Sequence, residues 1–143
     1  MGNRGGYAEG RKVGPMTNTT ETSSITETIE MHLEAYALGD ATRRDEMVAT
    51  AWNADGELLD PPLEGRGRAE ISALADVVLT HYAGHRFVRT TAVDSHHGFA
   101  RYGWDLTGPD GSVAVSGIDV VQFDEDGKLL RIVGFFGPLE SIA

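Results

Sequence analysis

Cysteine is absent from this sequence of 143 residues, which excludes disulfide bonds, thiolate catalysis and cysteine-bound zinc. Long apolar runs are absent too, so no segment is expected to cross a bilayer or to act as a secretory signal. Basic residues number 12 against 22 acidic ones, and the formal net charge is −10. Such a charge repels nucleic acid and anionic membranes. We therefore expect a cytoplasmic protein that binds neither.

The first 23 residues are rich in glycine and small polar residues. Such a segment cannot bury enough apolar area to offset the entropy of ordering it. We expect residues 1–23 to be a disordered or artificially added tail. The remaining residues, 24–143, suit a single domain, and a hydrophobic fraction of 41% is enough to build one core.

Three helices are expected in the first half of the domain, because apolar residues recur there at helical spacing. Ser24 and Glu27 have the spacing of a capping box, which predicts that the first helix begins at Ser24. The expected helices span residues 24–38, 42–52 and 68–82. A short strand over residues 57–60 is expected before the third helix, ended by Pro61.

From residue 85 onward the pattern changes to strands separated by turn sequences. The expected strands span residues 87–94, 99–106, 112–123 and 128–136. Helices followed by such a meander indicate an α+β fold, in which the helices pack on one face of a curved antiparallel sheet.

The strand at residues 112–123 is apolar on both faces. Val121 shares a face with Asp119, whereas Ile118 and Val120 lie on the opposite face. An antiparallel sheet usually keeps one face polar where it meets water. We therefore expect one face to cover the helices and a pocket, and the other to meet a second copy of the chain in a homodimer.

Five short motifs follow one another along the domain. They are Glu57-Leu-Leu-Asp-Pro61, Gly65-Arg-Gly67, Gly117-Ile-Asp-Val-Val-Gln-Phe123, Asp126-Gly-Lys128 and Gly134-Phe-Phe-Gly137. Together they resemble the nuclear transport factor 2-like superfamily, and within it the ketosteroid isomerase and SnoaL-like polyketide cyclase branch. The resemblance covers residues 25–140. It implies a cone-shaped fold whose three N-terminal helices and curved antiparallel sheet enclose an apolar pocket.

The resemblance also implies roles for four residues. Asp60 matches the general base of the isomerases, which lies in an Asp-Pro segment. Asp119 matches their second Asp, which is kept protonated and donates a hydrogen bond to the substrate oxygen, as is known from the isomerase itself. His32 stands where the isomerases carry a tyrosine, and Tyr36, one turn later, is the residue that could replace it. An imidazole that titrates near neutrality could also shuttle a proton.

Local sequence supports Asp119 independently, because a carboxylate between Ile118 and Val120 must be paired, hydrogen-bonded or protonated. Burial raises a carboxyl pKa, and a neutral acid in a dry pocket can donate to a carbonyl or enolate oxygen. The alternative is a structural carboxylate bonded to Arg89, Arg101 or a backbone amide. Asp60 likewise has a purely structural alternative, as a turn or cap residue before proline.

Aromatic residues are the expected walls of the pocket. The resemblance favours Trp104 and Phe136, whose matching positions in the isomerases face the ligand. Tyr102, on the same strand face as Trp104, and Trp52 complete the set of expected substrate-binding residues.

No metal site is expected. His81 and His85 have the i, i+4 spacing of a metal pair, but no acidic third ligand follows at a recognisable spacing. His96 and His97 fall in a turn sequence, where a site role is not expected.

The expected function is acid–base chemistry without a cofactor, namely isomerisation or cyclisation of a small apolar carbonyl compound. Epoxide opening and dehydration on the same scaffold are alternatives, because the scaffold hosts many reactions. A third hypothesis is a non-catalytic domain that binds a small molecule or mediates dimerisation.

Overall fold

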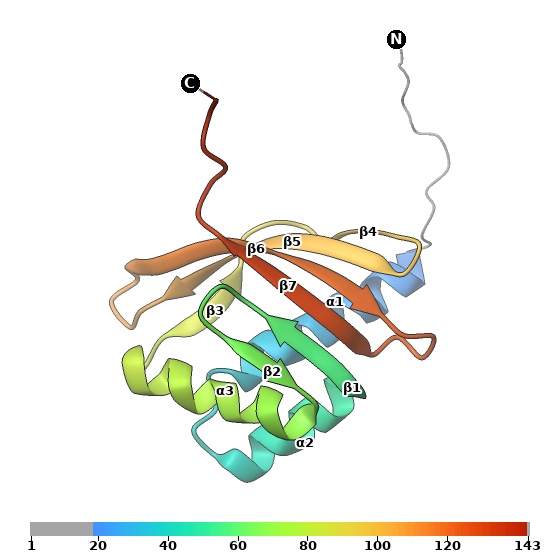
Figure 1. Ribbon diagram of the computed structural model, residues 1–143, viewed down its shortest axis with the longest axis horizontal. Helices are drawn as coiled ribbons and strands as arrows, with labels where there is room; N and C mark the ends of the chain where they lie inside the picture. Colours follow the sequence, from blue (N-terminus) through green and yellow to red (C-terminus); the bar gives the residue numbers. More distant parts are fainter. Residues whose placement is uncertain (1–18, 143) are drawn as a thin grey trace.

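The computed structural model describes residues 19–142, with side chains from residue 24 onward (Figure 1). The helices are α1 (Thr19–Ala35), α2 (Ala41–Ala51) and α3 (Arg68–His81). The strands are β1 (Trp52–Leu59), β2 (Glu64–Arg66), β3 (Arg86–Arg89), β4 (Asp94–His96), β5 (Phe99–Thr107), β6 (Val113–Phe123) and β7 (Leu129–Phe136). No helix in the described part of the chain is long and apolar enough to cross a membrane.

The strands form one curved seven-stranded sheet in the order β2-β1-β7-β6-β5-β3, with β4 also paired to β5. The α+β fold with helices packed on a curved sheet is as expected. The sheet is mixed, however, because β1 runs parallel to β7 while the other pairs are antiparallel. Strand β1 precedes the meander in the chain and docks beside its last strand. The alternation of residues within a strand does not predict whether that strand pairs parallel or antiparallel to its neighbour.

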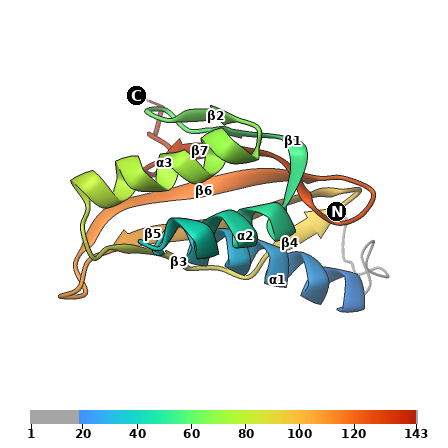
Figure 2. The ribbon, with the colours of Figure 1, turned by 90° about the horizontal axis from the view of Figure 1, so that it is seen from below.

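The three helices and the sheet share one core. Helix α3 contacts β1 and β2, α1 contacts β3, and α2 lies between the other two helices (Figure 2). Each helix and the two central strands bury an apolar side chain almost completely. These side chains are Ile29 in α1, Val48 in α2, Ile71 in α3, Val121 in β6 and Ile132 in β7. Burying residues of this size contributes roughly 1.5–3 kcal/mol each.

The start of α1 differs from the expectation. The helix already includes residues 19–23, and Ser24 lies inside it, where its carbonyl accepts a hydrogen bond from the Thr28 hydroxyl. The Ser24–Glu27 spacing is therefore not a capping box. Residues 1–18 of the expected tail lie outside the described residues. The next helix has a true cap, because Asp40 accepts hydrogen bonds from two amides in the first turn of α2.

Two strand predictions also need correction. The strand expected at residues 57–60 begins at Trp52 and pairs with β2, which the sequence pattern did not reveal. The strand expected at residues 87–94 is split into β3 and β4. The interruption has a visible cause, because the Gly103 amide donates to the Thr91 hydroxyl rather than to a backbone carbonyl of that strand.

The two faces of β6 differ as the sequence predicts. Asp119 and Val121 are buried on the inner face, whereas Ile118 is 47% exposed on the outer face. Strands β5 and β7 add large apolar side chains to that outer face. We call the group the outer sheet patch, which consists of Phe99, Ile118, Val120 and Phe135.

Candidate active site

Asp60 follows β1 and is fixed by a tight turn. Its amide donates to the Leu63 carbonyl at 2.8 Å, and the Leu63 amide donates back to the Asp60 carbonyl at 3.2 Å. Pro61 and Pro62 occupy the turn, so the backbone there has little freedom. Oxygen Oδ1 of Asp60 is buried and has no hydrogen-bond partner among the residues that the structure describes.

Asp60 lines an apolar cavity of about 390 Å³. This volume lies within the range of small-molecule sites, which are mostly apolar with few polar groups. Walls come from the β1–β2 turn, from the last turn of α3 and from the inner face of the sheet. The lining residues are Asp60, Pro62, Leu63, Val77, Val78, His81, Tyr82, Phe87, Trp104, Leu106, Val115 and Phe136.

Asp119 lies behind this cavity, and both of its oxygens are engaged by β5. The Tyr102 hydroxyl lies 2.7 Å from Oδ2, and Trp104 Nε1 donates to Oδ1 at 3.0 Å. Tyr102 is the direct cross-strand partner of Asp119. The expected arginine partners are instead paired elsewhere, Arg89 with an acidic residue of α1 and Arg101 with one of β4.

Gly134 makes room for the two carboxyl groups. It lies opposite Asp119 on β7. A methyl carbon placed on Gly134 would lie 3.1 Å from Asp119 Oδ1 and 3.1 Å from Asp60 Cγ, and closer still to Asp60 Oδ1. The two carboxyl groups are therefore at most about 6 Å apart, a range over which charges shift each other's pKa.

The environment raises the pKa of both carboxyl groups, and burial is the main cause in each case. The secondary causes differ between the two. Burial, followed by the negative charge of Asp119, raises the pKa of Asp60 to about 7. Burial also raises the pKa of Asp119 to about 6, against the opposing hydrogen bonds from Tyr102 and Trp104. The hydrogen bonds from Tyr102 and Trp104 favour the ionised form of Asp119, whereas Asp60 Oδ1 has no such donor within the described residues.

His32 is a buried imidazole in contact with the indole of Trp52. Trp52 Nε1 donates to its Nδ1 at 3.2 Å, and an indole nitrogen can only donate. The imidazole proton is therefore on Nε2. Burial lowers the pKa of His32 to about 4, so the ring does not titrate near neutrality as the sequence suggested.

The Tyr36 hydroxyl is not free to donate to a ligand, because its proton is already in a hydrogen bond. Its hydroxyl donates to the Ile71 carbonyl at 2.7 Å, and burial raises its pKa further. Tyr36 and His32 nevertheless border a second, small cavity of about 20 Å³ together with Asp60 and Asp119. The structure thus brings all four expected catalytic residues around one point.

The expected substrate-binding residues separate into two pairs. Trp104 and Phe136 line the large cavity, with their rings edge to face at 5.5 Å. Tyr102 and Trp52 are not among its lining residues. Both are almost completely buried, and their polar atoms bond to Asp119 and His32, respectively.

Sequence reasoning missed the wall that α3 contributes. Val77, Val78, His81 and Tyr82 come from its last turn and line the cavity. Their helical spacing was the available signal, but it does not tell a ligand-facing stripe from a core-facing one. Among the described side chains, no group of three or more His, Asp or Glu could hold a metal ion.

Comparisons with known proteins place this arrangement in a family. No protein-family model matches the chain, and no curated protein matches it either. Among solved structures, a SnoaL-like family protein from Agrobacterium tumefaciens, provisionally named an isomerase, is 32% identical. The match covers 84% of this chain and all of that one, with a TM-score of 0.75.

Two further solved structures show the same fold at lower identity. One is a SnoaL-like protein from Jannaschia, provisionally named a polyketide cyclase, at 13% identity and a TM-score of 0.66, covering 89% of this chain and 91% of that one. The other is an NTF2-like protein of unknown function from Burkholderia xenovorans, at 18% identity and a TM-score of 0.61, covering 86% and 91%. The chain belongs to the SnoaL-like family of the nuclear transport factor 2-like superfamily.

Proposed function

We propose that the protein catalyses proton transfer, without a cofactor, on a small apolar carbonyl compound, with Asp60 as the general base and acid. The observation that carries the proposal is Asp60, which lines an apolar cavity and whose buried Oδ1 has no partner in the described part of the chain. A pKa of about 7 suits this role, since a general base works best near the ambient pH. Isomerisation and cyclisation are the favoured reactions, because the SnoaL-like relatives carry those provisional names.

The proposed reaction consumes no cofactor and no second reactant. Ionised Asp60 removes a proton from the carbon next to the carbonyl, and the electron pair of that C–H bond moves to the carbonyl oxygen to form an enolate. In the isomerisation of an unsaturated ketone, Asp60, now protonated, returns the proton to the far carbon of the dienolate, and the carbonyl re-forms as the double bond moves. In a cyclisation, the enolate carbon instead bonds to a second carbonyl carbon of the same molecule, and Asp60 gives its proton to the alkoxide oxygen that forms. The apolar walls keep water from taking the proton.

Asp119 supports Asp60 in this scheme rather than touching the substrate. Trp104 Nε1 can only donate, so Asp119 Oδ1 must accept, and a proton on Oδ2 would face the Tyr102 hydroxyl. The charge of Asp119 instead raises the pKa of Asp60. The donor left for the enolate oxygen is Nε2 of His32, whose ring borders the small cavity beside Asp60.

The test uses 2-tetralone, a bicyclic apolar ketone, as probe. Exchange of its α-protons in D2O is followed by NMR with the wild-type protein, with Asp60→Asn and with the surface control Asp126→Asn. We expect protein-dependent exchange that falls by about 10²–10⁴-fold in Asp60→Asn only, the usual contribution of a positioned base. Exchange by Asp60→Asn at the wild-type rate would refute the assignment.

A second candidate, epoxide opening by water, is favoured by the small cavity. Its volume of about 20 Å³ suits one water molecule, and Asp60 and Asp119 both border it. Incorporation of ¹⁸O from labelled water into an epoxide probe would favour this reaction over isomerisation. Binding of both probes without turnover would favour the non-catalytic hypothesis.

We also propose that the outer sheet patch forms the interface of a homodimer. Its members are 40–58% exposed, large and apolar. They lie on the adjacent strands β5, β6 and β7, with Phe135 directly paired with Ile118. A contiguous apolar surface of this kind is unusual on a monomer.

A further inference from the structure

The large cavity has polar groups at two separate places. Four of its lining residues carry a polar side-chain atom. One of them, Trp104, already donates from its only polar atom, Nε1, to Asp119. Asp60 lies on the β1–β2 turn. The other two, His81 and Tyr82, lie at the C-terminal end of α3. Asp60 is half-buried, with its Oδ1 fully buried, whereas His81 and Tyr82 are exposed, so the second polar place is at the rim.

The hydrogen bond of His81 fixes which ring nitrogen is free for a ligand. Its Nδ1 lies 2.9 Å from the Val77 carbonyl, one turn back along α3. A carbonyl cannot donate, so Nδ1 carries the proton and Nε2 of the neutral ring has a lone pair. With Nδ1 held against the helix, the ring edge that carries Nε2 is the one turned away from it. The rim therefore offers a hydrogen-bond acceptor.

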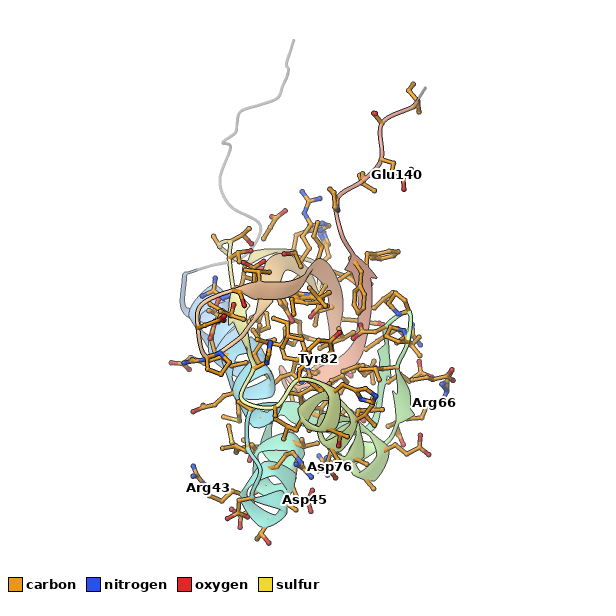
Figure 3. All side chains as sticks on the ribbon, turned by 90° about the vertical axis from the view of Figure 1, so that its left-hand side faces the viewer. Arg43, Asp45, Arg66, Asp76, Tyr82 and Glu140 are labelled. Carbon is orange, nitrogen blue, oxygen red and sulfur yellow. The ribbon has the colours of Figure 1, made fainter. Side chains whose placement is uncertain are left out.

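Tyr82 adds a hydroxyl that can both donate and accept. Its ring packs edge to face against His85, at 5.4 Å between centroids. In the view of Figure 3, Tyr82 is labelled between the end of α3 and the strands of the sheet. Both residues line the same cavity, so its rim offers an acceptor and a donor–acceptor group, which together match the two capacities of an alcohol or phenol.

We propose that His81 and Tyr82 form a binding site for a hydroxyl group, so that the preferred ligand is an apolar carbonyl compound with a hydroxyl at the end remote from Asp60. A carboxylate at that end is disfavoured, because it would face the lone pair of Nε2 on a chain of formal net charge −10. The inference rests on the proposed function in one respect, that the large cavity holds the substrate. It concerns binding and is measurable without turnover.

The experiment compares two ketones that differ by one group, 6-hydroxy-1-tetralone and 1-tetralone, by isothermal titration calorimetry. We expect the wild-type protein to bind the hydroxylated ketone about three- to ten-fold more tightly, as one or two neutral hydrogen bonds allow. His81→Ala should bind both ketones equally. The control His96→Ala, which removes an exposed histidine from outside the cavity lining, should keep the wild-type preference.

Each outcome bears on one proposal. Equal binding of both ketones by the wild-type protein, or an unchanged preference in His81→Ala, overturns the hydroxyl site. His81→Gln gives an independent check, because its amide oxygen can still accept and should restore part of the preference. A preference lost in His81→Ala, without any proton exchange on 2-tetralone, would support the hydroxyl site and count against catalysis alone.

Discussion

Replacing Gly134 by alanine perturbs the paired carboxyl groups without removing either one. The added methyl carbon would lie 3.1 Å from Asp119 Oδ1 and well inside 3.0 Å of Asp60 Oδ1, a distance that side-chain carbons essentially never show. Asp119 is held by two hydrogen bonds, whereas Asp60 Oδ1 has none within the described residues. Asp60 is therefore the group that moves.

The required movement is about 1 Å, and a misplacement of that size can lower a rate by about 10²-fold. Crowding a packed site costs typically 1–3 kcal/mol of stability. We expect Gly134→Ala to lose about 10²-fold in proton exchange on 2-tetralone and up to about 3 kcal/mol in the free energy of unfolding.

The pH dependence separates displacement of Asp60 from general damage. Burial and the charge of Asp119 raise the pKa of Asp60 to about 7. Moving Asp60 away from both lowers that pKa toward its ordinary value. The rising limb of the pH–rate profile should therefore shift to lower pH in Gly134→Ala, while a merely unstable variant would lose rate at every pH.

Gly39→Ala is the matched control, because a methyl carbon there meets no atom within 4 Å. It should exchange at the wild-type rate with the same limb near pH 7. A Gly134→Ala variant with wild-type rate and an unshifted limb would show that the arrangement of Asp60 beside Gly134 is not the reactive one.

Two further predictions concern stability and assembly. Because the folded-state pKa of Asp60 is raised to about 7, the folded protein binds more protons than the unfolded chain between about pH 4 and pH 7, and stability is lost as pH rises through this window. Asp60→Asn should therefore gain several degrees in its unfolding midpoint over the wild type at pH 8 and almost nothing at pH 4; an equal gain at both pH values would contradict the raised pKa. Ile118→Asp should convert a micromolar wild-type dimer to a monomer in sedimentation equilibrium, while Leu139→Asp, which changes a fully exposed apolar residue outside the outer sheet patch, should remain a dimer. A monomeric wild type, or a dimeric Ile118→Asp, would remove the patch as the interface.

What the sequence predicted well rests on residue alternation within single elements. The parity of β6 placed Asp119 and Val121 inside and Ile118 outside, because successive side chains in a strand alternate. The partners of Asp119 were not predictable in the same way. Tyr102 faces Asp119 only through the register between β5 and β6, and this register shifts between Leu106 and Thr107, at the end of β5.

Asp60 shows the opposite limit. The sequence around Asp60 predicts only a turn before two prolines. The position of Asp60 beside Asp119 depends on the parallel pairing of β1 with β7, which lies far along the chain. Only the family resemblance supplied that contact. The tautomer of His32 was not predictable for a related reason, since its hydrogen bond with Trp52 joins α1 to the start of β1.

Trp104 connects the cavity wall to the charges of the site. Its ring lines the cavity and packs against Phe136, while its Nε1 donates to Asp119. The hydrogen bonds from Trp104 and Tyr102 favour the ionised form of Asp119, and that charge in turn raises the pKa of Asp60. A ligand that pressed on the indole would therefore act on Asp60 through Asp119. The two carboxyl groups have different surroundings, because Asp119 has a donor on each oxygen whereas Asp60 Oδ1 has none within the described residues.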